Sequence, residues 1–213
     1  MNVFELLTEP KRYSNFALAY PLQDGGIYDV FDGRSLAAEW KAPVVIAADE
    51  DQDAAEFADF ALLGTVPVFS LQALEALLDL LRPNGEVLPL RFKGGEYFAY
   101  NVTRILPALD ETASSMTRFS TGRVMSIDRY VFRPELLDNA AVFKIPELPK
   151  AFVFVTDAFV ERIRATRLTG LVFSLLWHSL GSGSQACEMG QGSCICATDT
   201  MIRPQVDSRR KTR

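Results

Sequence analysis

The sequence predicts an α+β fold, in which a mixed, mostly antiparallel sheet carries a few helices and ends in a C-terminal β-α-β unit. Three observations support this prediction. Short apolar runs with β-branched and aromatic residues recur between turns that contain glycine or proline. Leucines within residues 70–81 follow helical spacing, and residues 151–177 alternate between strand-like and helical patterns.

Residues 1–48 predict short elements separated by turns. Residues 1–20 form a mixed opening segment in which Phe4 to Leu7 favour a short helix. Asp24-Gly25-Gly26 is a turn signal, and the alternating residues 27–31 after it predict a strand. Residues 44–48 are apolar and begin with β-branched residues, which predicts a second strand.

An acidic segment follows this strand. Its acidic residues are Asp49, Glu50, Asp51, Asp53, Glu56 and Asp59. Within it, Phe57, Phe60 and Ala61 predict the buried stripe of a short helix. A run of acids is commonly a solvated surface, and the alternative is a patch that binds a basic partner.

Residues 70–81 predict the clearest helix of the N-terminal half. Ser70 is a favourable N-cap. Positions i, i+3, i+4 and i+7 hold Leu74, Leu77, Leu78 and Leu81. Pro83-Asn84-Gly85 ends this helix.

The middle of the chain predicts a hairpin. Gly94-Gly95 is a two-residue link typical of a type I′ or II′ turn, with strands over residues 90–93 and 96–102. Pro89 cannot donate a backbone hydrogen bond, so its strand begins after it or lies at a sheet edge. Further strands are predicted at residues 124–132 and 141–145, after a polar surface loop at residues 109–122.

Residues 151–177 predict a strand, a helix and a second strand. Residues 151–155 are a short apolar run, and Thr156 and Asp157 then provide an N-cap and a first-turn acid. The apolar face of the helix is Phe159, Val160 and Ile163. Gly170 ends the helical part, and residues 171–177 predict the returning strand.

This pattern predicts two lobes that share one core. Residues 1–90 form an N-terminal α/β lobe with the leucine helix, and residues 91–180 form a C-terminal α+β lobe. Residues 181–213 contain no aromatic residue and much glycine and serine, which predicts a disordered tail.

The sequence contains no strong catalytic, metal or cofactor motif. Residues 181–186 match a GxGxxA pattern, but the residues after them are a poor helix, so a Gly/Ser linker is the better interpretation. Cys187, Cys194 and Cys196 lack the paired spacing of a structural zinc site. His178, the only histidine, has no sequence neighbour suited to acid–base chemistry. We therefore predict no catalytic residue, no metal and no cofactor.

A basic stretch contains Arg118, Arg123, Arg129 and Arg133. Asp128 interrupts it, and no aromatic platform for stacking bases is evident. The net charge of −5 and the isoelectric point near 5.0 also argue against a nucleic-acid partner.

The composition predicts a cytoplasmic protein. No apolar stretch approaches the roughly 20 residues that a membrane-spanning helix needs. The first residues lack the basic and apolar regions of a secretory signal. Residues 1–186 contain no cysteine, which is typical of a reducing compartment.

Several short motifs occur in an order that resembles one bacterial family. They are Phe31-Asp32-Gly33-Arg34-Ser35-Leu36 leading to Trp40, Val68-Phe69-Ser70, Asn84-Gly85-Glu86-Val87-Leu88-Pro89-Leu90, Tyr97-Phe98-Ala99-Tyr100-Asn101-Val102, Val142-Phe143-Lys144-Ile145, Phe154-Val155-Thr156 and Leu168-Thr169-Gly170-Leu171-Val172-Phe173. Over roughly residues 31–177, this order resembles immunity protein family 11 of polymorphic toxin systems, also called domain of unknown function 1629. The resemblance implies a non-enzymatic inhibitor that binds a cognate toxin.

The predicted function is therefore neutralisation of a bacterial toxin by tight binding. The predicted contact residues are Asp49, Glu50, Asp51, Asp53, Glu56 and Asp59, for the case of a basic toxin. One alternative is a small carboxylate-based hydrolase or ligand-binding enzyme, which requires a pocket holding a carboxylate of raised pKa. Another is an adaptor domain that binds something other than a toxin, and the oligomeric state stays open.

Overall fold

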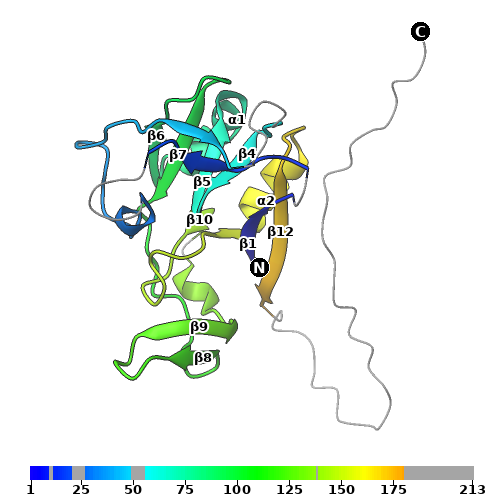
Figure 1. Cartoon of the computed structure of the whole chain (residues 1–213). Helices are drawn as coiled ribbons and strands as arrows, with labels where there is room; N and C mark the ends of the chain where they lie inside the picture. Colours follow the sequence, from blue (N-terminus) through cyan, green and yellow to red (C-terminus); the bar gives the residue numbers. More distant parts are fainter. Residues whose placement is uncertain (10–11, 21–26, 49–55, 138, 180–213) are drawn as a thin grey trace.

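The computed structural model describes residues 1–9, 12–20, 27–48, 56–137 and 139–179, and the chain forms an α+β fold (Figure 1). Two larger sheets make up the body. The first sheet has the order β10 (Val142–Phe143), β11 (Phe154–Thr156), β1 (Asn2–Thr8) and β12 (Leu171–His178). All its pairs are antiparallel. In this order β11 and β12, the two strands of the C-terminal β-α-β unit, lie on either side of β1.

The second sheet has six strands. Their order is β3 (Val45–Ala47), β2 (Phe16–Leu18), β4 (Phe60–Leu63), β5 (Val66–Ser70), β7 (Tyr97–Val102) and β6 (Gly85–Pro89). Only β2 and β4 run parallel, through the pair Phe16 and Leu63, so the predicted mixed and mostly antiparallel sheet is confirmed. Strands from either side of residue 90 occur in both sheets, and the division into lobes 1–90 and 91–180 stays a prediction.

A separate two-stranded hairpin lies at the lower end of the molecule in Figure 1. It consists of β8 (Ser115–Arg118) and β9 (Val124–Arg129), which pair with each other and with no other strand of the described chain. Its inner residues Met116 and Ile127 pack against a core cluster that contains Phe132 and Phe154.

Two α-helices fill the space beside the sheets. α1 (Leu71–Leu81) begins as predicted, because the Ser70 hydroxyl accepts a hydrogen bond from the Ala73 N–H at 3.1 Å. α2 (Asp157–Arg164) buries Phe159, Val160 and Ile163, the predicted apolar face. Residues of both helices, of β1 and of β4 and β5 belong to one core cluster, so each sheet buries a face against the same helices. Two short 3-10 helices complete the description, η1 (Ile27–Val30) and η2 (Pro134–Leu136).

Two predicted helices are strands. Residues 4–7, expected as a short helix, lie in β1, where Val3, Phe4 and Leu6 are buried and both edges are paired. Phe60 and Ala61, expected in another helix, begin β4 and are buried in two different core clusters. A strand buried on both faces is apolar throughout, so its periodicity does not distinguish it from a helix.

Other differences concern turns and ends. Residues 27–31, expected as a strand, contain η1. The hairpin expected around Gly94-Gly95 is present and its second strand is β7, but its first strand is β6 rather than residues 90–93. Pro89 ends β6 at the sheet edge, one of the two places expected for it. The polar segment 109–122, expected as a loop, contains β8, whose exposed residues lack an apolar stripe.

Thr156 occupies the N-cap position of α2, as predicted, but its side chain does not cap the helix. The Thr156 hydroxyl donates to the Ala140 carbonyl at 2.9 Å and caps no N–H of the helix. Asp157 does occupy the first turn, and its carboxylate accepts hydrogen bonds from the N–H and side-chain amide of Asn2, both at 2.8 Å. The start of α2 is therefore fastened to β1.

Candidate functional site

The predicted contact segment is only partly described. Asp49, Glu50, Asp51 and Asp53 lie outside the described residues. Glu56 is exposed, as a contact residue must be. Its place in a binding surface stays a prediction.

Asp59, the last acid of this segment, is engaged within the protein. One carboxylate oxygen accepts a hydrogen bond from the Ser70 hydroxyl at 2.9 Å. The other accepts from the Thr169 N–H and hydroxyl, both at 2.9 Å. Asp59 therefore connects the N-cap of α1 to the turn before β12. Its carboxylate has fewer free lone pairs for a partner than that of an isolated surface acid.

Three of the motifs that carry the family resemblance meet at Glu86. Its carboxylate accepts hydrogen bonds from the Ser35 hydroxyl, from the Leu36 N–H at 2.8 Å and from the Asn101 side-chain amide at 3.0 Å. Burial alone would raise the pKa of Glu86, but these hydrogen bonds outweigh it and lower the pKa below its ordinary value. The arrangement attaches the loop after η1 to the edge strand β6. Glu86 therefore stabilises the fold at this point.

Lys144 is a second buried charged group. It is 4% exposed, and its ammonium donates to the carbonyls of Phe31 at 2.5 Å and Pro149 at 2.8 Å. Burial lowers the pKa of Lys144 from 10.5 to about 8, while the nearby charge of Asp32 acts in the opposite direction. The side chain thus joins the η1 loop to the segment before β11. These hydrogen bonds hold the Lys144 ammonium inside the protein, so it is not a surface contact for a partner protein.

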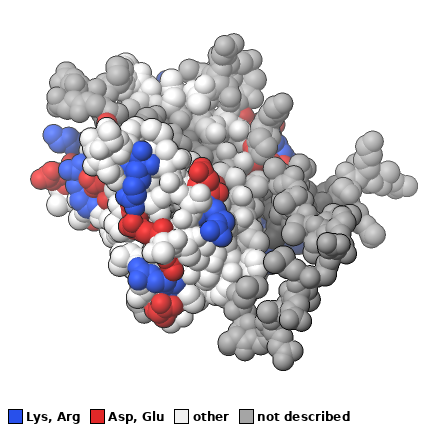
Figure 2. Space-filling view, turned by 90° about the horizontal axis from the view of Figure 1, so that it is seen from below, with Lys and Arg blue, Asp and Glu red and all other residues white. Residues whose placement is uncertain are grey.

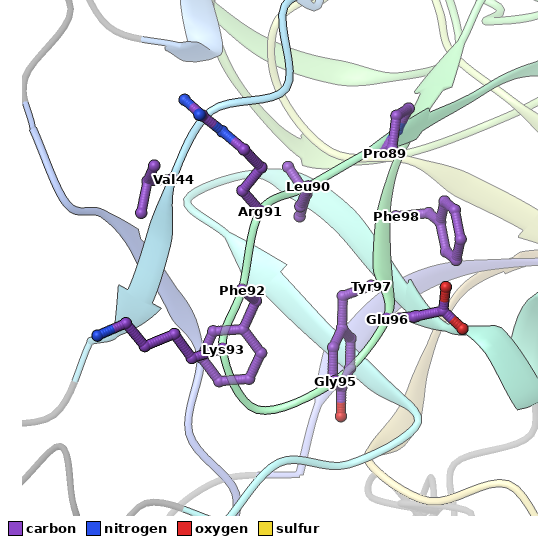
Figure 3. A pocket seen from close by; sticks show the side chains of 10 residues that line it. All are labelled: Val44, Pro89, Leu90, Arg91, Phe92, Lys93, Gly95, Glu96, Tyr97 and Phe98. Atoms are coloured by element: carbon purple, nitrogen blue, oxygen red, sulfur yellow. The ribbon is translucent and has the colours of Figure 1, made fainter.

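A pocket of about 410 Å³ lies at the turn between β6 and β7 (Figure 3). Figure 3 shows the rings of Phe92 and Tyr97 close together inside the turn, while Arg91 and Lys93 point away from it. The centres of the two rings are 5.8 Å apart. The Tyr97 hydroxyl donates to the Ala58 carbonyl at 3.1 Å. The pocket therefore has an aromatic floor without converging polar groups, which is a poor arrangement for catalysis.

A larger cleft of about 870 Å³ lies between the β8–β9 hairpin and the segment before β11. Its charged lining residues are Glu111, Arg118, Arg123, Glu147 and Lys150. Arg118 donates to the Glu111 carboxylate at 2.6 Å, and Lys150 pairs with Asp29 at 3.1 Å. One buried oxygen of Glu147 has no hydrogen-bond partner in the described structure.

Burial raises the pKa of Glu147, the nearby charge of Glu111 adds to the rise, and Arg118 and Arg133 act in the opposite direction. A carboxylate of raised pKa in a cleft is what the enzymatic alternative requires. This carboxylate belongs to Glu147, which is outside the predicted acidic segment. Neither Glu56 nor Asp59 lines this cleft.

Of the remaining sequence candidates, His178 lies within the described residues. His178 is exposed at the end of β12, opposite Asn2. The GxGxxA stretch, the three cysteines and the tail at 181–213 lie outside the described residues. Among the residues that are described, no group of three or more His, Cys, Asp or Glu could hold a metal ion. In the same part of the chain, no helix is long and apolar enough to cross a membrane.

Sequence analysis missed the hairpin and the cleft. The four arginines were recognised and the strand predicted over residues 124–132 contains β9, but β8 was not predicted, because its one inward residue, Met116, stands among exposed polar residues. Gly122, in the turn between the strands, gave the available signal. Its φ of +83° is the left-handed conformation that glycine adopts readily.

These features describe an α+β protein with a projecting hairpin, a wide cleft and, in its described part, no converging catalytic group. The model of the Immunity protein family (Imm11) matches residues 90–176 of the chain. The resemblance predicted from the motifs is therefore confirmed over these residues, a shorter span than the predicted 31–177. No curated protein matches the chain.

Proposed function

We propose that this protein is an immunity protein that binds a cognate bacterial toxin and neutralises it without catalysis. The observation that carries the proposal is the family match over residues 90–176. The fold is compatible with it, since two sheets packed on shared helices form a rigid body that loses little conformational entropy on binding.

The first contact surface to test is the acidic segment, with Asp49, Glu50, Asp51, Asp53, Glu56 and Asp59. Replacement of Asp49, Asp51 and Asp53 by Asn should slow association with a basic toxin and reduce its salt dependence. A matched control removes three exposed acids elsewhere, with Glu75→Gln, Glu135→Gln and Glu161→Gln. Equal association rates for the two variants would remove this segment from the proposal.

The binding itself is tested by calorimetric titration of the full chain with the toxin domain encoded next to its gene. Saturable nanomolar binding, about −12 kcal/mol, is the expected result, with a non-cognate toxin domain as control. No heat and no co-elution, with the toxin still active in the presence of the protein, would contradict the proposal.

The raised pKa of Glu147 favours one alternative, a carboxylate-based hydrolase or ligand-binding enzyme. Stoichiometry distinguishes the two functions. A binding inhibitor abolishes toxin activity at one molecule per toxin, whereas a catalyst would inactivate an excess of toxin with time. Full inactivation of the toxin by much less than one molecule of this protein per toxin would support the enzymatic function, provided that Glu147→Gln abolishes it.

A further inference from the structure

The β8–β9 hairpin differs in charge from the rest of the protein. Residues 111–133 contain four arginines and two acids, a net charge of +2, whereas the whole chain carries −5. Figure 2 views the molecule from the side on which the hairpin lies in Figure 1, and basic and acidic side chains are interspersed there among uncharged atoms. This surface can therefore make both charged and uncharged contacts with a partner.

The tip of the hairpin exposes large apolar side chains. Phe119 is 42% exposed and Met125 is 50% exposed. The Arg123 guanidinium lies 5.6 Å from the centre of the Phe119 ring. Arginine, methionine and aromatic residues are the types enriched in protein–protein interfaces.

The tip is also held in one conformation. The Phe119 N–H donates to the Arg123 carbonyl at 2.9 Å, and the Gly122 N–H donates back to the Phe119 carbonyl at 2.9 Å. Arg118 donates to the Gly122 carbonyl at 2.8 Å. A turn fixed by its own hydrogen bonds loses little entropy when it binds, which favours affinity.

The cleft beneath the hairpin supplies a second contact. Its wall before β11 includes Glu147, whose buried oxygen lacks a hydrogen-bond partner in the described structure. This oxygen is closed to solvent, so the wall offers a partner shape rather than a hydrogen bond at this atom.

We infer that the β8–β9 tip and the cleft beneath it bind an acidic surface of a protein partner, with partner carboxylates at Arg123 and an apolar side chain against Phe119 and Met125. The inference rests on the proposed function, under which this partner is the toxin. The hairpin lies inside the family-matched residues 90–176, whereas the acidic segment lies outside them.

A protein fits this surface better than a nucleic acid. Glu111 and Glu147 line the cleft beside the arginines, and Asp128 is exposed on β9. These carboxylates would repel a phosphate backbone, whose binding depends on many uncompensated cations. A protein partner can set single carboxylates against Arg123 and place uncharged groups opposite Glu111, Glu147 and Asp128, which a continuous phosphate backbone cannot do.

The test uses the full chain and the toxin domain encoded next to its gene. The tip variant carries Phe119→Ser, Arg123→Gln and Met125→Ser, all at exposed positions. The matched control carries Tyr20→Ser, Arg164→Gln and Leu175→Ser, which are also exposed and do not line the cleft. Thermal unfolding verifies that both are folded, and a single Arg123→Glu variant replaces the tip variant if it is not. A single-stranded oligonucleotide at 0.15 M salt is the second probe.

The tip variant should bind the toxin at least about tenfold more weakly, or 1.4 kcal/mol, with the control within about twofold of the unmodified chain. Equal toxin affinity in the tip variant would overturn the inference and leave the proposed function intact. Equal losses in the tip and control variants would also overturn it. Oligonucleotide binding that the tip variant abolishes would overturn it in favour of a nucleic-acid partner. Failure of the unmodified chain to bind the toxin would overturn both proposals.

Discussion

Lys144 makes the stability of this protein depend on pH in the alkaline range. Its pKa is about 8 in the folded protein, against an ordinary value of 10.5 for the unfolded chain. Between these two values the unfolded state binds more protons, so the free energy of unfolding rises with pH. The difference of about 2.5 pH units corresponds to a penalty of about 3 kcal/mol for the ammonium form, fully present at neutral pH. About 2 kcal/mol of this penalty should disappear between about pH 7 and 9.5.

The assay is denaturant unfolding of the unmodified chain and of Lys144→Met across this pH range. Methionine removes the titrating group along with the hydrogen bonds to Phe31 and Pro149, so the informative quantity is how the stability difference changes with pH. The unmodified chain should gain about 2 kcal/mol over the variant as pH rises, because a neutral amine still donates to both carbonyls. The exposed Lys93→Met is the control and should show no such change. A stability difference that stays constant with pH would refute the argument that burial penalises the Lys144 ammonium.

Three further predictions concern stability. Gly170→Ala should destabilise by about 3 kcal/mol, because φ is +86° and the new Cβ would lie 2.4 Å from the Phe60 carbonyl oxygen. Gly122→Ala, with a similar φ but nothing within 4 Å, should cost only about 1 kcal/mol, and equal losses in the two unfolding curves would exclude the clash. Leu77→Ala, at a fully buried position, should cost about 2–5 kcal/mol in chemical unfolding, and Leu71→Ala, 37% exposed, much less. Deletion of residues 1–8 removes the strand between β11 and β12 and should abolish cooperative thermal unfolding; a preserved transition would show that β1 is dispensable.

Sequence patterns predicted the elements whose signals are local. The α1 leucines have helical spacing, and Ser70 caps the helix as expected, since both features depend on a few neighbouring residues. The β1 strand was missed because its conformation depends on pairing with residues about 150 positions away, a distance over which local propensity carries no information. The Glu86 site shows the same limit. Ser35 and Asn101 are unremarkable in sequence and acquire their role only when the loop after η1 folds onto β6. The acidic segment was predicted as one surface, yet Asp59 bonds to Ser70 and Thr169 while Glu56 is exposed.

The residues that match the family model do not correspond to a unit that could fold alone. Residues 90–176 include β7, β11 and nearly all of β12, but both sheet neighbours of β7 and the strand between β11 and β12 lie outside them. A fragment cut to the match would leave several edges unpaired in the middle of two sheets, which favours aggregation. The β8–β9 hairpin lies within the match, but its Met116 and Ile127 pack on a cluster that also contains Val3. Failure of such a fragment to show the proposed toxin binding would therefore reflect loss of the fold, and the proposed contact surface has to be mapped by point changes in the full chain.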